Sequence, residues 1–180
     1  MKTSIQENSA GDNDKDAQLE YLMRRFGKQV HKLAYYYLRD KHLAEDICQE
    51  VFIKIYHNMG KFRNESSYFT WIYRITVNLC KDYLKSATFK RFVTEGFVDN
   101  WYRSAMKTNE LFEEVDGGEV FNMVMSLPKK YRVPISLHYF DGFSVSEISK
   151  IMKISESNVK VRLHRGRKML KDLLSLEVVK

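Results

Sequence analysis

Basic and short polar side chains alternate with apolar positions along residues 156–171 of the chain. Val159, Leu163 and Leu170 recur at helical spacing, so the residues between them face outward. Arginine and lysine can neutralise DNA phosphates, and short polar side chains at a helix start can reach base edges in the major groove. The pattern predicts a DNA-reading helix; a helical hairpin with a solvated basic face is the alternative. The candidate base contacts are Glu156, Asn158 and Arg162, and the candidate phosphate contacts are Lys160, His164, Arg165 and Arg167.

A second group of candidate DNA contacts runs from residue 62 to residue 85. Its first part is rich in aromatic and small polar side chains, which can stack on unpaired bases and hydrogen-bond to them. The members that follow are spaced four, three and four residues apart, so they form one polar stripe along a helix. Core packing is the alternative for the aromatic residues. The candidates are Phe62, Arg63, Asn64, Ser66 and Trp71 for unpaired bases, and Arg74, Asn78, Lys81 and Lys85 for the duplex.

Asp46, Gln49 and Glu50 have the spacing that places side chains on one face of a helix. Carboxylates and amide oxygens can accept hydrogen bonds from basic residues of a partner protein. Phe52 could add an apolar anchor beside them. A divalent cation is the weaker interpretation, because neither a histidine nor a second carboxylate cluster accompanies the pair. We interpret these residues as a protein-docking face.

Nothing in the sequence has the spacing of a catalytic, cofactor or metal site. The five histidines are scattered, and Cys48 and Cys80 form no CxxC pair. The sequence contains no Ser-His-Asp pattern and no glycine-rich phosphate loop. We therefore expect no cofactor, no metal and no enzymatic activity.

Charge is distributed unevenly along the 180 residues, which carry a net charge of +7. Two basic blocks, typical of proteins that bind a polyanion, flank an acidic segment at 94–118 that ends in Asp-Gly-Gly. Hydrophobic residues make up 44% of the chain, enough for a packed core, yet no apolar run is long enough to span a membrane. The polar N-terminus lacks an export signal, so we expect a cytoplasmic protein.

Apolar residues recur at helical spacing through most of the chain, so the expected fold class is all-α. Helices are predicted at 16–38, from the N-cap Asp40 to Gly60, and from Ser66 or Ser67 onward. Shorter helices precede and follow Pro128, with a bend expected at Pro134.

A capping box formed by Ser144 and Glu147 opens the next helix, and Ser155 caps the one that follows. The short turn between them has helix-turn-helix spacing. The expected organisation is two small helical domains joined by a flexible acidic linker. It comprises a disordered tail at 1–15, a helical bundle at 16–93, the linker at 94–118 and a helix-turn-helix domain at 119–180.

Two stretches of the chain resemble the sigma-70 family of RNA polymerase sigma factors, in its small extracytoplasmic-function (ECF) group. The first comprises AEDICQEVFIKIY at 44–56 and FRNESSYFTWIYRITVN at 62–78. The second comprises LPKKYR at 127–132 and VKVRLHRGR at 159–167. One departure is Ser157-Asn158, where many relatives have Gly-Thr, so the base preference of the second stretch cannot be carried over.

The resemblance implies a protein that binds core RNA polymerase and directs it to promoters, while catalysis belongs to the polymerase. It implies that the face formed by Asp46, Gln49 and Glu50 docks on a coiled coil of the largest polymerase subunit, and that the C-terminal domain meets the polymerase flap. It assigns the minus-10 element to the first domain and the minus-35 element to the second, with the linker in the polymerase cleft. The expected partners are core polymerase, promoter DNA and a membrane-linked anti-sigma factor that sequesters the chain at the inner face of the membrane. No small-molecule substrate is expected.

The alternative function is a free-standing helix-turn-helix regulator that binds operators as a dimer. It explains residues 144–174 equally well. It leaves the docking face and the aromatic segment without a role, and no dimerising heptad is present. A metal-dependent nuclease is disfavoured because it would need a second carboxylate or histidine cluster.

Overall fold

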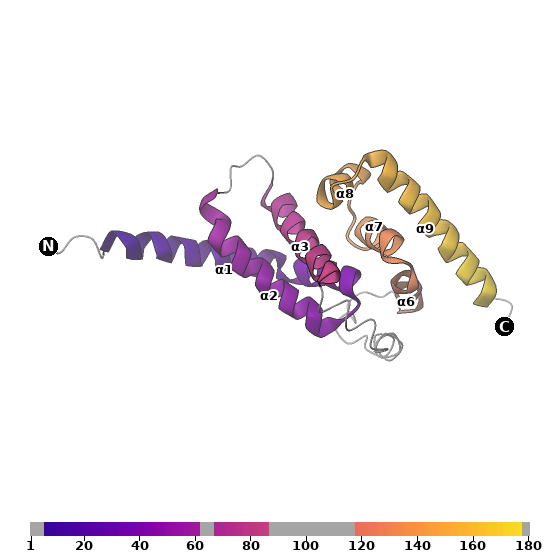
Figure 1. The fold of residues 1–180 in the computed structure, drawn as a ribbon, viewed down its shortest axis with the longest axis horizontal. Coiled ribbons are helices and arrows are strands. Elements are labelled where there is room, and N and C mark those ends of the chain that lie inside the picture. Colours follow the sequence, from indigo (N-terminus) through magenta and orange to yellow (C-terminus); the bar gives the residue numbers. More distant parts are fainter. Residues whose placement is uncertain (1–5, 62–66, 87–117, 178–180) are drawn as a thin grey trace.

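The computed structural model describes residues 6–61, 67–86 and 118–177, and every regular element within these ranges is a helix (Figure 1). This confirms the all-α expectation. The first unit contains α1 (Gln6–Leu38), α2 (Lys41–Asn58), the short 3-10 helix η1 (Met59–Lys61) and α3 (Tyr68–Lys85). The second unit contains α6 (Gly118–Ser126), α7 (Lys129–Tyr139), α8 (Val145–Met152) and α9 (Glu156–Glu177). The expected acidic linker lies outside the described residues, apart from Gly118, which begins α6.

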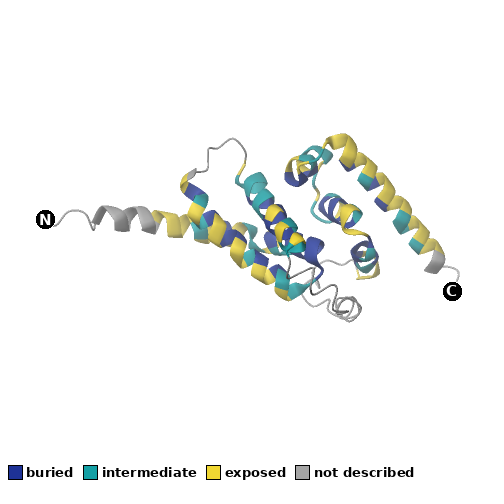
Figure 2. Ribbon diagram, in the orientation of Figure 1, coloured by how far each residue is buried: buried dark blue, intermediate teal, exposed yellow. Residues whose placement is uncertain are grey.

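The three long helices of the first unit pack as a bundle whose inner faces are buried (Figure 2). Removing an aliphatic side chain from water contributes about 1.5–3 kcal/mol, so this burial holds the bundle together. Both expected caps form: Asp40 Oδ1 accepts from the Leu43 N–H at 2.9 Å, and Ser67 Oγ accepts from the Thr70 N–H at 3.3 Å. The buried side chains include Leu22, Val30, Leu33, Ile47, Val51, Ile55, Ile72, Val77 and Leu79.

Helix α1 begins at Gln6, well before the expected start at residue 16. The expectation of a disordered tail is therefore wrong for residues 6–15. A polar segment shows no helical periodicity, but it can extend a helix that packing already holds, because propagation adds one backbone hydrogen bond per residue after nucleation. The resulting helix projects beyond the bundle (Figure 1).

The second unit is a compact set of four helices around buried side chains such as Phe121, Leu137 and Ile148. Pro128 precedes the first turn of α7, as expected. Pro134 lies inside α7, yet the helix continues to Tyr139. Pro134 therefore does not end the helix.

The helix-turn-helix expectation is confirmed by its caps and its turn. Ser144 Oγ accepts from the Glu147 N–H at 3.2 Å, and Glu147 Oε2 accepts from the Ser144 N–H at 2.9 Å. Helix α8 ends at Met152, and the next residue, the C-cap Lys153, has a left-handed backbone with φ 54° and ψ 53°. Ser155 Oγ accepts from the Asn158 N–H at 3.2 Å and opens α9.

Helices α7 and α9 approach each other closely at Gly166. A methyl group at this position would lie 2.8 Å from Ile135 Cγ1, well inside van der Waals contact. Since only glycine lacks that carbon, Gly166 fixes how closely α9 can pack on α7.

We predict that Lys153→Gly stabilises the protein, because the left-handed conformation crowds the Cβ of an L residue and glycine carries no such penalty. The free energy of unfolding should rise by about 0.5–1 kcal/mol, measured by urea denaturation. The matched control is Lys150→Gly inside α8, which should lower it by about 1 kcal/mol. Equal losses in the two variants would contradict the prediction.

Candidate DNA and polymerase interfaces

The candidate DNA contacts of α9 are exposed or half-buried, but they divide between two flanks of the helix. Helical spacing places Asn158, Arg162 and Arg165 on one flank, and Lys160 and Arg167 on the other. Arg162 Nε donates to Asn158 Oδ1 at 2.8 Å, which orients two of the three side chains of the first flank. The remaining candidates, Glu156 and His164, are exposed.

On the candidate docking face of α2, the three polar residues are exposed to solvent and the apolar residue is buried. Asp46, Gln49 and Glu50 are exposed, and Glu50 lies 3.6 Å from Lys54 Nζ in a solvent-exposed pair. Phe52 is 5% exposed and belongs to the core of the bundle, so the expected apolar anchor is wrong. The next residue, Ile53, is 56% exposed and lies on the same face. The sequence signal that could have identified Ile53 was its position three residues after Glu50, which places it on the same helix face.

The candidate minus-10 contacts are described only in part. Phe62, Arg63, Asn64 and Ser66 lie outside the described residues. The ring of Trp71 packs edge-on against Tyr68, with centroids 6.3 Å apart, and is half-buried.

The polar stripe of α3 is split by the second unit. Asn78 and Lys85 are exposed, as expected. Arg74 Nε instead donates to the Lys150 carbonyl at 3.0 Å, and Lys81 Nζ donates to the Met152 carbonyl at 3.2 Å. Both carbonyls belong to the last turn of α8, so these two cations already have partners within the chain.

Arg132, in α7, connects the two units through backbone carbonyls. Arg132 is 5% exposed, and its guanidinium donates to the Tyr36 carbonyl at 2.7 Å and the Tyr37 carbonyl at 3.2 Å, both at the end of α1. It also donates to the Met125 and Leu127 carbonyls, at 3.2 and 3.1 Å. Satisfied donors make a buried cation tolerable, so these carbonyls hold Arg132 in place.

Asp141 and an aromatic cluster complete the contact between the units. The Tyr36 hydroxyl donates to Asp141 Oδ1 at 3.3 Å. The Phe143 ring lies 4.9 Å from Phe69 and 5.4 Å from Tyr73, measured between centroids. Burial raises the pKa of the Asp141 carboxyl to about 6, against the opposing effects of Lys32 and the Tyr36 hydroxyl.

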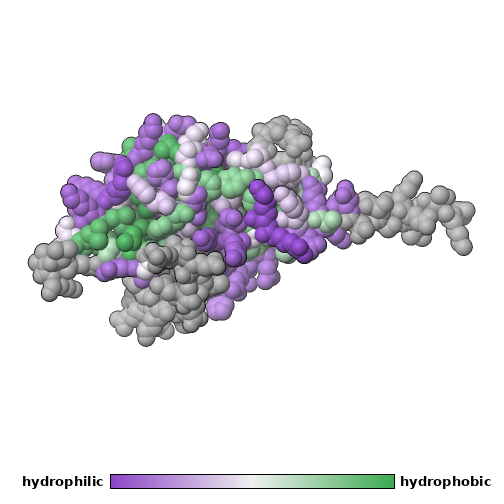
Figure 3. All heavy atoms as spheres, turned by 180° about the vertical axis from the view of Figure 1, so that it is seen from behind, coloured by the Kyte–Doolittle hydropathy of each residue, from purple (hydrophilic) through white to green (hydrophobic). Residues whose placement is uncertain are grey.

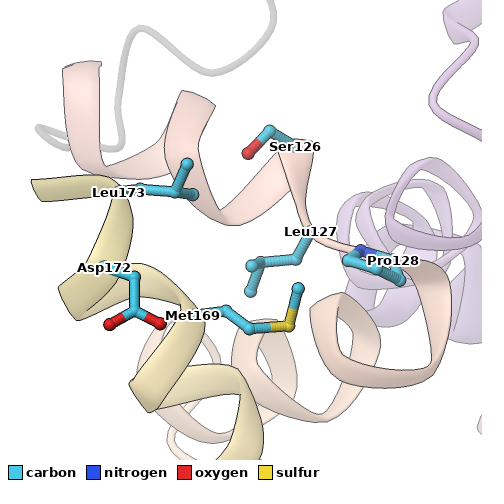
Figure 4. Close-up of a pocket in the computed structure, with 6 residues that line it drawn as sticks. All are labelled: Ser126, Leu127, Pro128, Met169, Asp172 and Leu173. Atoms are coloured by element: carbon cyan, nitrogen blue, oxygen red, sulfur yellow. The ribbon is translucent and has the colours of Figure 1, made fainter. Parts of the chain in front are cut away.

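Two apolar depressions flank the C-terminal half of α9. One lies against the junction of α6 and α7 and is lined by Leu127, Pro128, Met169 and Leu173 (Figure 4). The other lies between α6, α7 and α9, and Figure 3 shows apolar atoms in the half of the molecule that holds these helices. It is lined by Val120, Val124, Ile135, Tyr139, Phe140, Leu170 and Leu174, with Arg167 and Lys171 at its rim.

The described residues contain no group of three or more histidine, cysteine, aspartate or glutamate side chains that could hold a metal ion. No described helix combines the length and apolar character needed to cross a membrane.

The fold and surfaces together define an all-helical DNA-binding protein of two units, the second a helix-turn-helix. Residues 22–89 match the family described as Sigma-70 region 2, and residues 118–170 match Sigma-70, region 4. The chain belongs to the sigma-70 family of RNA polymerase sigma factors, in its ECF group.

Similar sequences extend over nearly the whole chain. The ECF RNA polymerase sigma factor SigW of Bacillus subtilis is 33% identical, over 97% of this chain and 96% of the relative. SigM of the same organism is 28% identical, over 86% of this chain and 94% of the relative. The ECF RNA polymerase sigma-E factor of Escherichia coli is 32% identical, over 69% and 70%. RNA polymerase sigma factor function follows, and the dimeric operator-binding regulator is not favoured.

Solved structures share the fold. CnrH, in complex with the cytosolic domain of CnrY, superposes with a TM-score of 0.63 at 20% identity, covering 89% of this chain and 90% of that one. The sigma factor RpoE of Bartonella quintana, in complex with the anti-sigma factor NepR, gives a TM-score of 0.59 at 18% identity, covering 88% and 97%.

We predict that Asp141 makes stability depend on pH. Its folded pKa of about 6 lies above the ordinary 3.8, so the folded state binds this proton more tightly than the unfolded state. That stabilisation is present at low pH and is lost as the pH rises through 6. Between pH 5 and 7 the free energy of unfolding of the unmodified chain should fall by about 1–3 kcal/mol relative to Asp141→Asn, measured by urea denaturation at each pH.

The control for this prediction is Asp172→Asn, which changes an exposed aspartate of α9 and should leave the pH profile as it is. Parallel profiles for Asp141→Asn and the unmodified chain would show that the prediction is wrong.

Proposed function

We propose that this ECF sigma factor docks on core RNA polymerase through the face of α2 formed by Asp46, Gln49, Glu50 and Ile53. The observation that carries the proposal is the combination of exposed acceptors and one exposed isoleucine on a single helix face. Such a face suits a coiled coil of the largest polymerase subunit that presents basic and apolar side chains. In this role the chain supplies promoter choice and the polymerase supplies catalysis.

We propose that the first unit reads the minus-10 element and the second unit the minus-35 element. The minus-10 contacts would come from residues 62–66, Trp71 and the polar stripe of α3. The minus-35 contacts would come from the flank of α9 that carries Asn158, Arg162 and Arg165, because these side chains lie together and the first two are already oriented by a hydrogen bond. Lys160 and Arg167 would approach phosphates from the other flank.

Two further partners belong to the proposal. The apolar depression at Val124, Tyr139 and Leu170 would receive the polymerase flap, since it exposes apolar side chains beside two cations. A membrane-linked anti-sigma factor would hold the chain inactive in the cytoplasm. This last point is supported by the resemblance to structures determined with NepR and with a cytosolic domain of CnrY.

We predict that Asp46→Ala with Glu50→Ala weakens binding to core polymerase by about 10- to 100-fold, because each desolvated charge pair contributes on the order of 1 kcal/mol or more. Titration of the labelled chain with purified core enzyme measures this. The matched control is Asp14→Ala with Asp16→Ala, which removes equal charge from exposed sites on α1. Equal affinities for the two double variants would refute the docking face.

Substitutions at Ile53 and Phe52 separate binding from stability. Titration with core polymerase measures the first, and urea denaturation measures the second. Ile53→Ser should weaken binding by about tenfold without loss of stability, because an exposed side chain is removed. Phe52→Ser should instead lower the free energy of unfolding by about 3 kcal/mol or more, because a core side chain is lost.

We predict different losses for the two arginines of α9 when the assembled polymerase binds promoter DNA. Arg165→Ala should weaken all promoters alike and reduce the salt slope by about 1, as expected for a phosphate contact. Arg162→Ala should relax preference at one minus-35 position, at a cost of about 1–3 kcal/mol. Binding to a set of singly substituted promoters at several salt concentrations separates these effects. Lys168→Ala, which removes an exposed lysine of α9 to which the proposal assigns no contact, is the control, and an identical loss for all three variants would contradict the assignment.

A further inference from the structure

The first turn of α3 carries two aromatic rings on one face of the helix. Tyr68 and Trp71 are three residues apart in the sequence. Their rings meet edge to face, with centroids 6.3 Å apart and planes inclined by 67°, an arrangement in which aromatic rings attract each other. Both residues are half-buried, so part of each stays accessible to a ligand. The orientation of one ring therefore constrains the orientation of the other.

A glutamine of α1 fixes the position of Tyr68 from outside α3. Gln18 Nε2 donates to the Tyr68 hydroxyl oxygen at 2.8 Å, although the two residues are 50 positions apart in the chain. The hydroxyl is the polar end of the phenol, and Trp71 contacts its ring. Tyr68 is therefore held both at its hydroxyl and at its ring, and Gln18 is linked through it to Trp71.

The packing of α1 against α3 places the donor and the acceptor of this bond. The Phe69 ring lies 6.2 Å from the Phe26 ring of α1, measured between centroids, so the first turn of α3 rests against α1. On the other side, α1 begins at Gln6, about three helical turns before Gln18. Because the unpaired N–H groups of a helix start lie in its first turn, Gln18 is clear of the end that frays.

The contribution of this bond to folding is small. Gln18 is exposed and Tyr68 is half-buried, so water can replace either partner if the bond is lost. The core of the bundle is formed instead by apolar side chains, such as Leu22 and Ile72, that are buried completely or nearly so. The bond therefore orients side chains at the start of α3 more than it stabilises the unit.

Taking the proposed reading of the minus-10 element as its basis, we propose that Gln18 and Tyr68 are positioning residues that hold the ring of Trp71 ready to stack on an unpaired promoter base. Trp71 touches the base, whereas Gln18 acts through Tyr68. A ring that is already oriented loses less freedom when a base stacks on it, so binding to the opened strand is strengthened. Closed duplex offers no unpaired base, so its binding gains nothing from this arrangement.

The test assembles the full chain with core RNA polymerase and compares its binding to two promoter fragments. One is duplex throughout and is kept closed by low temperature, and the other has a minus-10 element whose bases are mismatched and therefore unpaired. Gln18→Ala should weaken binding to the mismatched fragment by about 2- to 10-fold, as expected for the loss of one hydrogen bond. Binding to the closed duplex should stay the same. The matched control is Gln29→Ala, at another exposed glutamine of α1, which should change neither.

A double-mutant cycle tests whether Gln18 acts through Tyr68. Tyr68→Phe keeps the ring and removes only the hydroxyl, so its loss on the mismatched fragment should equal that of Gln18→Ala. The double variant should lose no more than either single variant, because both substitutions remove the same bond. Losses that multiply in the double variant would overturn the positioning role.

Two further measurements separate positioning from a merely structural role. Urea denaturation and titration with core polymerase should give the same values for Gln18→Ala, Tyr68→Phe and the unmodified chain. A loss of stability, a loss of affinity for core polymerase, or an equal loss on both promoter fragments would show that the bond only supports the fold, and would overturn the proposal.

Trp71→Leu, which keeps an apolar side chain but removes the ring, distinguishes failure of this inference from failure of the proposed function. It should weaken binding to the mismatched fragment more than Gln18→Ala does. Unchanged binding of Trp71→Leu to that fragment would refute the minus-10 contact of Trp71, and the positioning role with it. A loss for Trp71→Leu beside unchanged binding of Gln18→Ala would refute the positioning role alone.

Discussion

The arrangement of the two units depends on the buried guanidinium of Arg132. Its donors meet carbonyls at the end of α1 and near the end of α6, two places where a helix leaves acceptors without internal partners. A buried cation is costly to leave unsatisfied, so the ends of these helices must stay where the guanidinium can reach them. The same chemistry recurs at α8, whose last carbonyls accept from Arg74 and Lys81. Helix ends and basic side chains are the recurring means by which one unit holds the other.

This means of cohesion is open to competition. A phosphate carries a full negative charge and a helix end only part of one, so a polyanion can displace carbonyls from exposed or half-buried cations. Arg132 is different, because it is buried and its acceptors surround it. The contact thus combines one buried cation with two half-buried ones.

The sequence was sufficient for the helices, apart from the start of α1, because caps and apolar periodicity are local signals. Asp40, Ser67 and the pair Ser144 and Glu147 all form the caps that their types and positions predicted. Phe52 was misassigned because its place in the buried stripe depends on the packing of α2 against its neighbours, whereas its chemistry alone suits an anchor equally well. The partners of Arg74, Lys81 and Arg132 could not be predicted either. Each of these partners is a backbone carbonyl distant in sequence. Because every residue has a backbone carbonyl, the residue types do not reveal which one accepts the hydrogen bond.

In helix α9, the buried positions that constrain packing are separate from the exposed positions that can be substituted. Val159, Leu163 and Gly166 face α7 and α8, and Gly166 admits no side chain without displacing Ile135. The side chains proposed to read DNA stand on the flanks, where most substitutions change stability by no more than about 0.5 kcal/mol. A few surface substitutions could therefore change which promoters this protein prefers, while the buried scaffold stays the same. Gene duplication followed by such drift would give sister proteins of one architecture that command different sets of genes.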